Sequence, residues 1–347
     1  MASFLLTVWH PLVDALFAPS PLQHRWRLLC LLPVSLIVGI WKASPYIFSR
    51  PYVVCQIPTR RAHETIRVLV YNHPSQCSKP KGDGKRPLHI DIHGGGFIGG
   101  IPEEDVPFCT ELAQTTGAVV VSVTYRLAPR HPFPAAHDDV ADALAWLVEN
   151  CAGEFEADNR IVTVSGFSAG GNLALGATLG AKDSEGEKLI KGAVTFYNPV
   201  DLRLPPQEKR KPPGFPSFDP FWFLLPLFDA YAGPDRTANL SNPKLHPTLA
   251  SPEDLPDAIL FVIPTVDFLL YEQLDMVERL STAIPQEKAG APRSPKTRRY
   301  EKLVFEGQLH GWLELPSWAI DESTRRKAFA SACDFLMDVD VTRTSRC

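Results

Sequence analysis

The sequence predicts an α/β fold with a mostly parallel central sheet that is flanked by helices. Short apolar runs rich in β-branched residues are typical of buried strands, and they occupy residues 88–92, 118–125, 161–166, 192–197, 258–263 and 300–305. Segments with helical spacing of apolar residues lie between or after them, at 137–150, directly after 168, and at 318–337. Because strands and helices alternate along the chain, we expect parallel strands covered on both faces.

The composition excludes several classes of protein. The 347 residues are 45% hydrophobic and 21% charged, which is globular composition with enough chain for a large core. The formal net charge of −4 supplies no basic surface, so no nucleic-acid partner is expected. The seven cysteines are scattered and form no CxxC pair, which argues against a disulfide framework or a zinc site. We therefore expect a reducing compartment and no metal.

An apolar run at residues 28–41 dominates the N-terminus, with basic residues on both sides. As a helix it is short for a hydrocarbon core of about 30 Å, and Pro33 weakens it further as a spanning segment. It lacks a cleavage pattern of small residues, so a cleaved signal peptide and secretion are not expected. Two interpretations stay open for residues 1–50: helices that cap an active site, or a membrane anchor or interfacial helix. The expected localisation is cytoplasmic, or membrane-associated through this segment.

The segment 201–250 interrupts the alternation of strands and helices. It starts with a loop rich in Pro and Lys and continues with an aromatic group: Phe215, Phe218, Phe221, Trp222, Phe223 and Phe228. A connection of this length inside a compact domain is usually functional or disordered, and the aromatic content argues against disorder. The segment is therefore predicted to form a lid or a wall of a substrate pocket.

The motif "GFSAGG" at residues 166–171 places Ser168 at the centre of a G-x-S-x-G pattern. It follows the predicted strand 161–166 and opens a helix, which is the context of a nucleophile elbow. In such a turn the serine Oγ is held above the sheet, near a helix N-terminus that favours developing negative charge. Ser168 is therefore predicted to be a nucleophile; the alternative is a glycine-rich structural turn.

A serine nucleophile needs a general base. In a strand–elbow–helix context the base is a histidine that comes after the acid in the chain, and only His246 and His310 follow Ser168. His310 lies on a loop past the last predicted strand, where ligands meet parallel sheets. His310 is therefore the predicted base, whereas His246 falls in the predicted lid.

The base needs an acid that orients it. Asp267 follows the strand 258–263 and is flanked by apolar residues, which indicates a buried position that requires a partner. Asp201, which follows the preceding strand, is the competing candidate. We predict Asp267 as the acid and expect Glu272 to support the same loop.

A second motif, "HGGGF" at residues 93–97, follows the strand 88–92. Acyl transfer passes through a tetrahedral oxyanion that needs preorganised N–H donors, and bare glycines can present them with no side chain in the way. A phosphate loop is the alternative, but the spacing fits neither G-x-G-x-x-G nor a P-loop. His93 is expected to brace this loop. The predicted oxyanion hole consists of Gly94, Gly95, Gly96 and Ala169.

The chain resembles the hormone-sensitive-lipase-like group of α/β-hydrolase esterases. The resemblance rests on "HGGGF", "YRLAP", "PFPAAHDDV", "GFSAGG", "NPKLHPTLA", "VDFL" and "LHGW", which occur in the family's order from about Pro87 onward. It implies an α/β-hydrolase domain at 51–347, a helical cap built from the N-terminus and the 201–250 insertion, and no cofactor. Phe167 departs from the family, which usually has Asp there, and Trp312 stands where Phe is usual.

These features predict a serine carboxylesterase that hydrolyses a hydrophobic carboxylic ester through an acyl-enzyme intermediate, in secondary metabolism. The expected partner is a small hydrophobic ester, and the oligomeric state stays open. Two alternatives are kept. The same triad would serve an amide or lactone hydrolase, and some relatives that lost the catalytic histidine are small-molecule receptors. The presence of both His310 and Asp267 disfavours a receptor.

Overall fold

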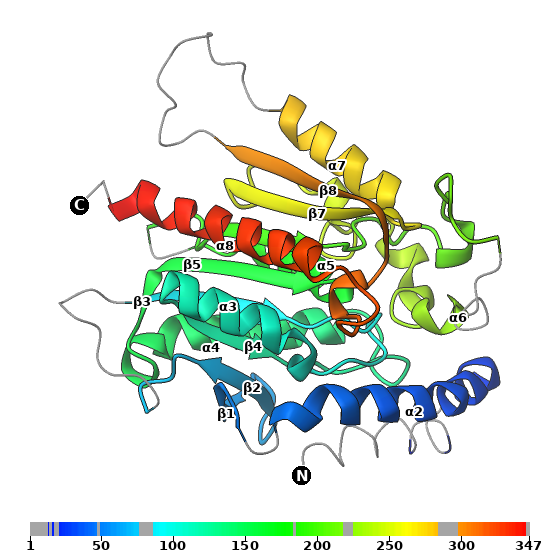
Figure 1. The fold of residues 1–347 in the computed structure, drawn as a ribbon, viewed down its shortest axis with the longest axis horizontal. Coiled ribbons are helices and arrows are strands. Elements are labelled where there is room, and N and C mark those ends of the chain that lie inside the picture. The colour runs from blue at the N-terminus through cyan, green and yellow to red at the C-terminus, as the bar shows by residue number, and fades with distance from the viewer. Residues whose placement is uncertain are drawn as a thin grey trace.

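The structure, a computed structural model, describes residues 13, 16, 21–46, 49–75, 86–182, 185–217, 225–283 and 298–344. A single eight-stranded sheet lies at its centre, with the strand order β1-β2-β4-β3-β5-β6-β7-β8 (Figure 1). The strands are β1 (Tyr52–Pro58), β2 (Thr65–Tyr71), β3 (Arg86–Ile92), β4 (Val119–Val123), β5 (Ala157–Phe167), β6 (Ile190–Phe196), β7 (Ala258–Val266) and β8 (Arg299–Leu309).

Most neighbouring strands of this sheet run parallel. Only the pairs β1–β2 and β2–β4 are antiparallel, and β3 to β8 continue the sheet with parallel pairing. The mostly parallel sheet expected from the sequence is therefore confirmed, and each predicted strand overlaps one of the strands from β3 to β8. Parallel strands bring their carboxyl ends to one edge of the sheet, where ligands of such folds bind.

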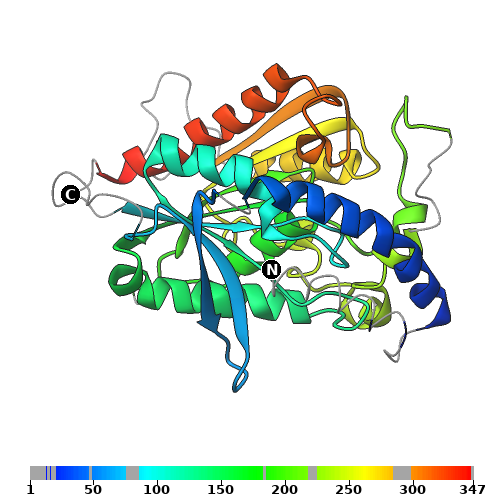
Figure 2. The same cartoon turned by 60° about the horizontal axis from the view of Figure 1, so that its bottom comes forward.

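Helices cover both faces of the sheet (Figures 1 and 2). One face carries α3 (Val106–Thr116) and α8 (Glu322–Thr344), and the other carries α4 (Ala135–Glu154), α5 (Ala169–Thr178) and α7 (Leu270–Thr282). The buried apolar side chains divide in the same way. Leu173 and Met276 belong to the cluster on the α4–α5–α7 face, whereas Phe108 and Phe329 belong to the cluster on the α3–α8 face. This three-layer arrangement is the expected way to bury a parallel sheet.

The first two strands and two of the helices were not predicted from the sequence. β1 lies at the edge of the sheet, and most of its side chains are only partly buried, so it lacks a continuous apolar run. The helix α3 has Pro107 in its first turn and ends at Gly117, which adopts a left-handed φ of 71° and is a common helix terminator. The helix α7 was missed although its pattern is helical: its buried residues include Leu270, Gln273 and Val277, which lie three and four positions apart.

The helix α2 (Leu22–Ala43) precedes the sheet and packs against α6 (Leu225–Phe228) and the 3₁₀ turn η2 (Pro102–Asp105). Within the described residues no single helix is long and apolar enough to cross a membrane. The segments His24–Pro33 and Ile37–Tyr46 pass that test only as a pair, on length and composition, with a bend of 44° between them.

The segment between β6 and β7 contains mostly short turns. They are η3 (Pro206–Glu208), α6, η5 (Gly233–Asp235), η6 (Thr237–Asn239) and η7 (Pro247–Leu249). Of the aromatic group predicted to line a pocket, Phe218, Phe221, Trp222 and Phe223 fall outside the described residues. Phe228 lies in α6 and contacts the apolar core, so this part of the segment packs onto the domain.

Candidate active site

Four chemically important segments begin directly after the last residues of four parallel strands. The glycine loop starts at His93 after β3, Ser168 follows β5, Asp267 follows β7, and His310 follows β8. The sheet topology therefore brings residues that are far apart in sequence to one edge. It also explains why strand signals in the sequence located them.

Ser168 occupies a sharp turn between β5 and α5. Its backbone has φ 47° and ψ −118°, a conformation that L-residues rarely adopt, and its N–H donates to the carbonyl of Phe196 at 2.8 Å. A Cβ at Gly166 would lie 2.3 Å from the carbonyl oxygen of Gly170, and one at Gly170 would lie 1.9 Å from that of Ile92. Glycine is thus required at both positions, and the turn packs directly against the strand that leads into the glycine loop.

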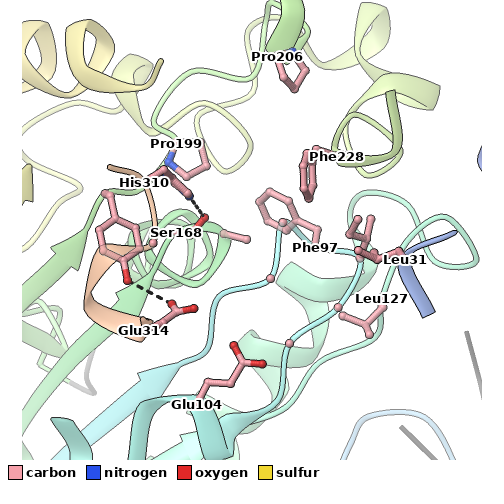
Figure 3. Close-up of a pocket in the computed structure, with 18 of the residues that line it drawn as sticks. Leu31, Phe97, Glu104, Leu127, Ser168, Pro199, Pro206, Phe228, His310 and Glu314 are labelled. Carbon is pink, nitrogen blue, oxygen red and sulfur yellow. Dashed lines mark hydrogen bonds between the residues drawn. The ribbon is translucent and has the colours of Figure 1, made fainter. Parts of the chain in front are cut away.

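Ser168, His310 and Asp267 form a continuous hydrogen-bond chain. The Oγ of Ser168 lies 2.8 Å from Nε2 of His310, and Nδ1 of His310 lies 2.8 Å from Oδ2 of Asp267. The first of these bonds is drawn in Figure 3. Asp267 is fully buried, and its second oxygen accepts a hydrogen bond from the N–H of Leu269 at 2.9 Å. The carboxylate is therefore fixed in position to hold the imidazole.

The electrostatic surroundings favour a protonated imidazole at His310. Burial alone would lower its pKa, but the charge of Asp267, the hydrogen bond to that carboxylate and the charge of Glu314 outweigh burial, so the net pKa is raised. An imidazole that gains a proton easily is suited to accept one from a neighbouring hydroxyl.

The competing candidates lie elsewhere in the fold. Asp201 forms hydrogen bonds and an ion pair with Arg203, so its carboxylate is committed to that guanidinium. His246 is fully buried, and its Nδ1 accepts a hydrogen bond from the N–H of Leu202 at 3.0 Å. Neither takes part in the chain that contains Ser168.

The expectation for Glu272 needs correction. It was expected to support the loop of Asp267, but Oε1 of Glu272 accepts hydrogen bonds from the N–H groups of Val200 and Asp201, at 2.9 and 3.2 Å. Its other oxygen binds Nζ of Lys209 at 2.5 Å. Glu272 therefore supports the loop after β6, and its place on α7, whose first turn follows β7, allows it to reach across to that loop.

The glycine loop adopts a backbone that other residues could not follow. Gly95 and Gly96 have φ values of 108° and 61°. A Cβ at Gly95 would lie 2.1 Å from the carbonyl oxygen of Gly99, and one at Gly96 would lie 2.6 Å from the ring of Phe228. Among the described residues, the N–H groups of Gly95, Gly96 and Ala169 have no hydrogen-bond acceptor within the protein. These amides are therefore free to meet an oxygen atom of a ligand.

His93 holds the base of this loop. Burial lowers the pKa of its imidazole to about 4, so the ring is neutral near pH 7, and its Nδ1 lies 2.8 Å from the carbonyl oxygen of Gly94. The ring stacks on Tyr125 with centroids 4.4 Å apart, and the Tyr125 hydroxyl lies 3.0 Å from the carbonyl oxygens of His93 and Gly94. His93 therefore braces the loop through packing and a backbone contact, as was expected of it.

A cavity of about 400 Å³ opens above Ser168. Its walls are mostly apolar and come from the glycine loop, α2, α6 and the loops after β6, β7 and β8 (Figure 3). From α2 the lining residues are Leu28, Leu31, Leu32, Val38 and Gly39. Among the described members of the predicted aromatic group, Phe228 lines the cavity. The two parts of the chain predicted to form a cap thus both reach this space.

Comparison with known proteins decides the family. Residues 89–291 match the family described as alpha/beta hydrolase fold. The chain belongs to this family. An esterase from the archaeon Pyrobaculum calidifontis has a similar solved structure, with a TM-score of 0.67 and 29% identity over 89% of this chain and 91% of that one.

Curated relatives of this α/β hydrolase are similar over shorter stretches. Carboxylesterase NlhH of Mycobacterium tuberculosis is 40% identical over 121 residues, 34% of this chain and 37% of the relative. The hormone-sensitive lipase of Ictidomys tridecemlineatus is 32% identical over 160 residues, 46% of this chain and 20% of the relative. The chain thus spans about a third or less of the length of these curated relatives. The resemblance to the hormone-sensitive-lipase-like group is nevertheless confirmed.

Two acidic residues of the cavity were not identified by the sequence analysis of this hydrolase. Glu104 lies in η2, just past the glycine loop, and Glu314 ends the 3₁₀ turn η8 (Trp312–Glu314), four residues after His310. Both lie in short turns without apolar periodicity, so only their nearness in sequence to the two motifs could have indicated them. Within the described residues, no group of three or more His, Cys, Asp or Glu side chains is placed to hold a metal ion.

Proposed function

We propose that this α/β hydrolase is a serine carboxylesterase, with Ser168 as nucleophile, His310 as general base and acid, and Asp267 as the residue that orients the base. One observation carries the proposal: the 2.8 Å contacts that link the three side chains open onto a cavity bordered by unpaired backbone N–H groups. This combination of nucleophile, base and oxyanion donors is what acyl transfer requires.

The proposed reaction has two steps. His310 accepts the Ser168 proton while Oγ attacks the ester carbonyl, and the N–H groups of Gly95, Gly96 and Ala169 stabilise the oxyanion. Collapse of this intermediate expels the alcohol, which takes the proton from His310. Water then attacks the acyl-enzyme by the same route and releases the acid. Gly94 helps to hold the loop in shape, because its carbonyl oxygen contacts the His93 imidazole and accepts a hydrogen bond from the Tyr125 hydroxyl.

The cavity walls support a substrate with a hydrophobic part. Leu31 and Val38 from α2 and Phe228 from α6 line it together with the glycine loop. Apolar walls of this kind bind a ligand by removing apolar surface from water. We therefore propose an ester whose acyl or alcohol part is apolar and fits a space of about 400 Å³.

The experiment compares the wild type with Ser168→Ala on p-nitrophenyl esters of increasing acyl length and on matched p-nitroanilides. We expect the wild type to hydrolyse the esters and Ser168→Ala to lose about 10³-fold or more in turnover while keeping its fold, because a triad member is removed. Labelling of the wild type by an organophosphonate, absent in Ser168→Ala, is the second readout. Unchanged hydrolysis by Ser168→Ala would refute the assignment, and anilide turnover equal to ester turnover would favour an amidase.

A further inference from the structure

The apolar cavity above Ser168 contains two carboxylates that the proposed reaction does not use. Glu104 comes from η2 on one wall and Glu314 from η8 on the adjoining wall. Figure 3 shows both side chains on the opposite side of Ser168 from Pro199 and Pro206. They come from different parts of the chain and face one region of the cavity.

Within the described residues, neither carboxylate forms an ion pair. Other glutamates do, since Glu103 pairs with Arg67 and Glu272 pairs with Lys209. In the part of the chain that the structure describes, Glu104 and Glu314 form no ion pair within 4 Å. Glu314 accepts one hydrogen bond from the Tyr197 hydroxyl at 3.2 Å, which leaves most of its acceptor capacity unused.

Glu104 and Glu314 are close enough for the charge of one to affect the ionisation of the other. The pKa of Glu104 is raised to about 8, first by burial and then by the charge of Glu314, while the charge of Lys42 on α2 lowers it, so Glu104 holds its proton near pH 7 unless a cation lies beside it. A positive charge beside the two groups would therefore offset both the desolvation cost of their ionised forms and the repulsion between them. Lys42 supplies only part of this positive charge. Its Nζ lies over the Trp41 ring, 5.7 Å from the centroid, and forms no ion pair with Glu104.

The cationic groups among the described lining residues, Lys209 and protonated His310, do not neutralise Glu104 and Glu314. Lys209 also lines the cavity, but its Nζ lies 2.5 Å from Oε2 of Glu272 and 2.7 Å from the carbonyl oxygen of Asp201. The charge that His310 gains on protonation faces Asp267. Among the described residues, the ionisable groups that face the cavity without a partner of opposite charge are therefore acidic, and a substrate carboxylate would be disfavoured beside them.

We propose that Glu104 and Glu314 form a cation subsite of the cavity and that the ester substrate carries a positively charged nitrogen. The inference rests on the proposed esterase function and names the substrate class for it. The charged nitrogen takes no part in bond making or breaking. It is held beside the two carboxylates while the apolar part of the substrate contacts the leucines of α2 and the ester carbonyl meets Ser168.

The test uses substrate pairs that differ in charge and not in shape. Acetylcholine is compared with 3,3-dimethylbutyl acetate, which places the charge in the alcohol, and glycine betaine ethyl ester with ethyl 3,3-dimethylbutanoate, which places it in the acyl part. The readout is the ratio of kcat/KM for the charged ester to that for its neutral partner. Quaternary nitrogens do not titrate, so only the protein's groups change with pH.

Glu104→Gln and Glu314→Gln remove one charge each and keep the shape, and Gln at position 314 keeps an acceptor for Tyr197. We expect the ratio in at least one substrate pair to fall about tenfold in each variant. Comparing the ratio between proteins cancels the intrinsic reactivity of the esters and any general loss of activity. Glu149→Gln, which removes a charge from an exposed position of α4, is the matched control and should keep the wild-type ratio.

Two outcomes separate this inference from the proposed function. Hydrolysis of the neutral esters with unchanged ratios in both Gln variants would overturn the cation subsite and leave the esterase proposal standing. Absence of hydrolysis of every ester would refute the esterase proposal, and choline binding to wild type and Glu104→Gln, measured by calorimetry, then tests the subsite alone. If a Gln variant fails to fold, choline and 3,3-dimethylbutan-1-ol are compared as inhibitors of the wild type, and equal inhibition would overturn the subsite.

Discussion

Ser168 adopts a left-handed backbone conformation that is tolerable only because of its neighbours. Its φ of 47° would be unfavourable in an isolated chain, but β5 and α5 hold it on either side. Gly166 leaves room for the backbone of Gly170, and Gly170 leaves room for the end of β3. The strain sets the direction of Oγ, which points to Nε2 of His310. The backbone conformation, the two glycines and the hydrogen bond to His310 therefore together fix the position of Ser168 Oγ.

The acid of the triad gives a prediction with a close control. Asp267→Asn keeps the size of the side chain but favours the wrong imidazole tautomer, so we expect turnover to fall about 10⁴-fold. Asp201→Asn alters a carboxylate that pairs with Arg203 and should retain most of the activity. Steady-state kinetics on one p-nitrophenyl ester measures both, and the opposite pattern would show that Asp201 is the acid.

The pH profile provides an independent check on the same pair. The pKa of His310 is raised, and the base must be neutral to accept the serine proton, so activity should be lost as the pH falls through a value above that of an ordinary histidine. Without the negative charge of Asp267 the pKa falls, so the residual activity of Asp267→Asn should persist to lower pH. If the acidic side of the pH–activity profile stays at the same pH in Asp267→Asn, a group other than His310 controls the loss of activity.

At the scale of elements, the sequence located those parts whose burial is continuous. Five of the six predicted strands, those from β3 to β7, lie inside the sheet, and a strand covered on both faces is apolar along its length. The sixth, β8, is an edge strand that is only partly buried. Ser168 and Asp267 could be selected as candidates because each directly follows a buried strand, and His310 because it follows β8, whose short apolar run was recognised. The edge strand β1 and the helix α3 were missed, since partial exposure in one and Pro107 in the other mask their patterns. Glu104 and Glu314 were missed because tertiary packing alone brings their turns together.

Asp105, the last residue of η2, and Asp91 form a pair of buried acids that affects stability. Asp91 on β3 accepts hydrogen bonds from the hydroxyls of Ser165 and Ser122, at 2.6 and 3.0 Å. Asp105 precedes α3, is 2% exposed and has no well-formed hydrogen bond to either carboxylate oxygen. Burial raises the pKa of both groups, and the charge of Asp91 raises that of Asp105 further. The pair therefore favours at least one retained proton.

This pair predicts how stability depends on pH. A carboxyl whose pKa is raised by folding holds its proton only in the folded state, so its contribution to stability falls as the pH rises from the unfolded pKa toward the folded one. We expect Asp105→Asn to gain stability relative to the wild type between pH 6 and pH 9, measured by urea unfolding at both values. Asp275→Asn, at an exposed position of α7, should follow the wild type. Equal pH dependence of Asp105→Asn and wild type would contradict the prediction.

At the scale of the whole molecule, the N-terminal segment completes the cavity. The helix α2 contributes five residues to the lining, while its other side exposes apolar residues such as Trp26, Ile37 and Trp41. The first observation supports a cap, and the second fits contact with a membrane surface through a helix that lies at the interface. We propose that the cap is its main role, because the lining residues lie on the side that faces Ser168.

Deletion of residues 1–45 tests this role. Without α2 the apolar wall of the cavity is lost while the triad stays complete, so we expect a larger loss of kcat/KM for a bulky hydrophobic ester than for a small acetate ester. Circular dichroism controls for folding, and sedimentation of the full-length protein with membranes is measured in parallel. Unchanged selectivity together with loss of membrane sedimentation in the truncated protein would establish an anchor in place of a cap.

The cavity is assembled from both ends of the chain, and this has a consequence during protein synthesis. Ser168 and the glycine loop are synthesised well before His310 and Glu314, which follow β8. The leucines of α2, made first, cannot enclose the cavity until that final strand has joined the sheet. On the proposed mechanism a nascent chain thus holds a serine without a base, and the hydroxyl becomes reactive only after His310 has been made and β8 has paired with β7.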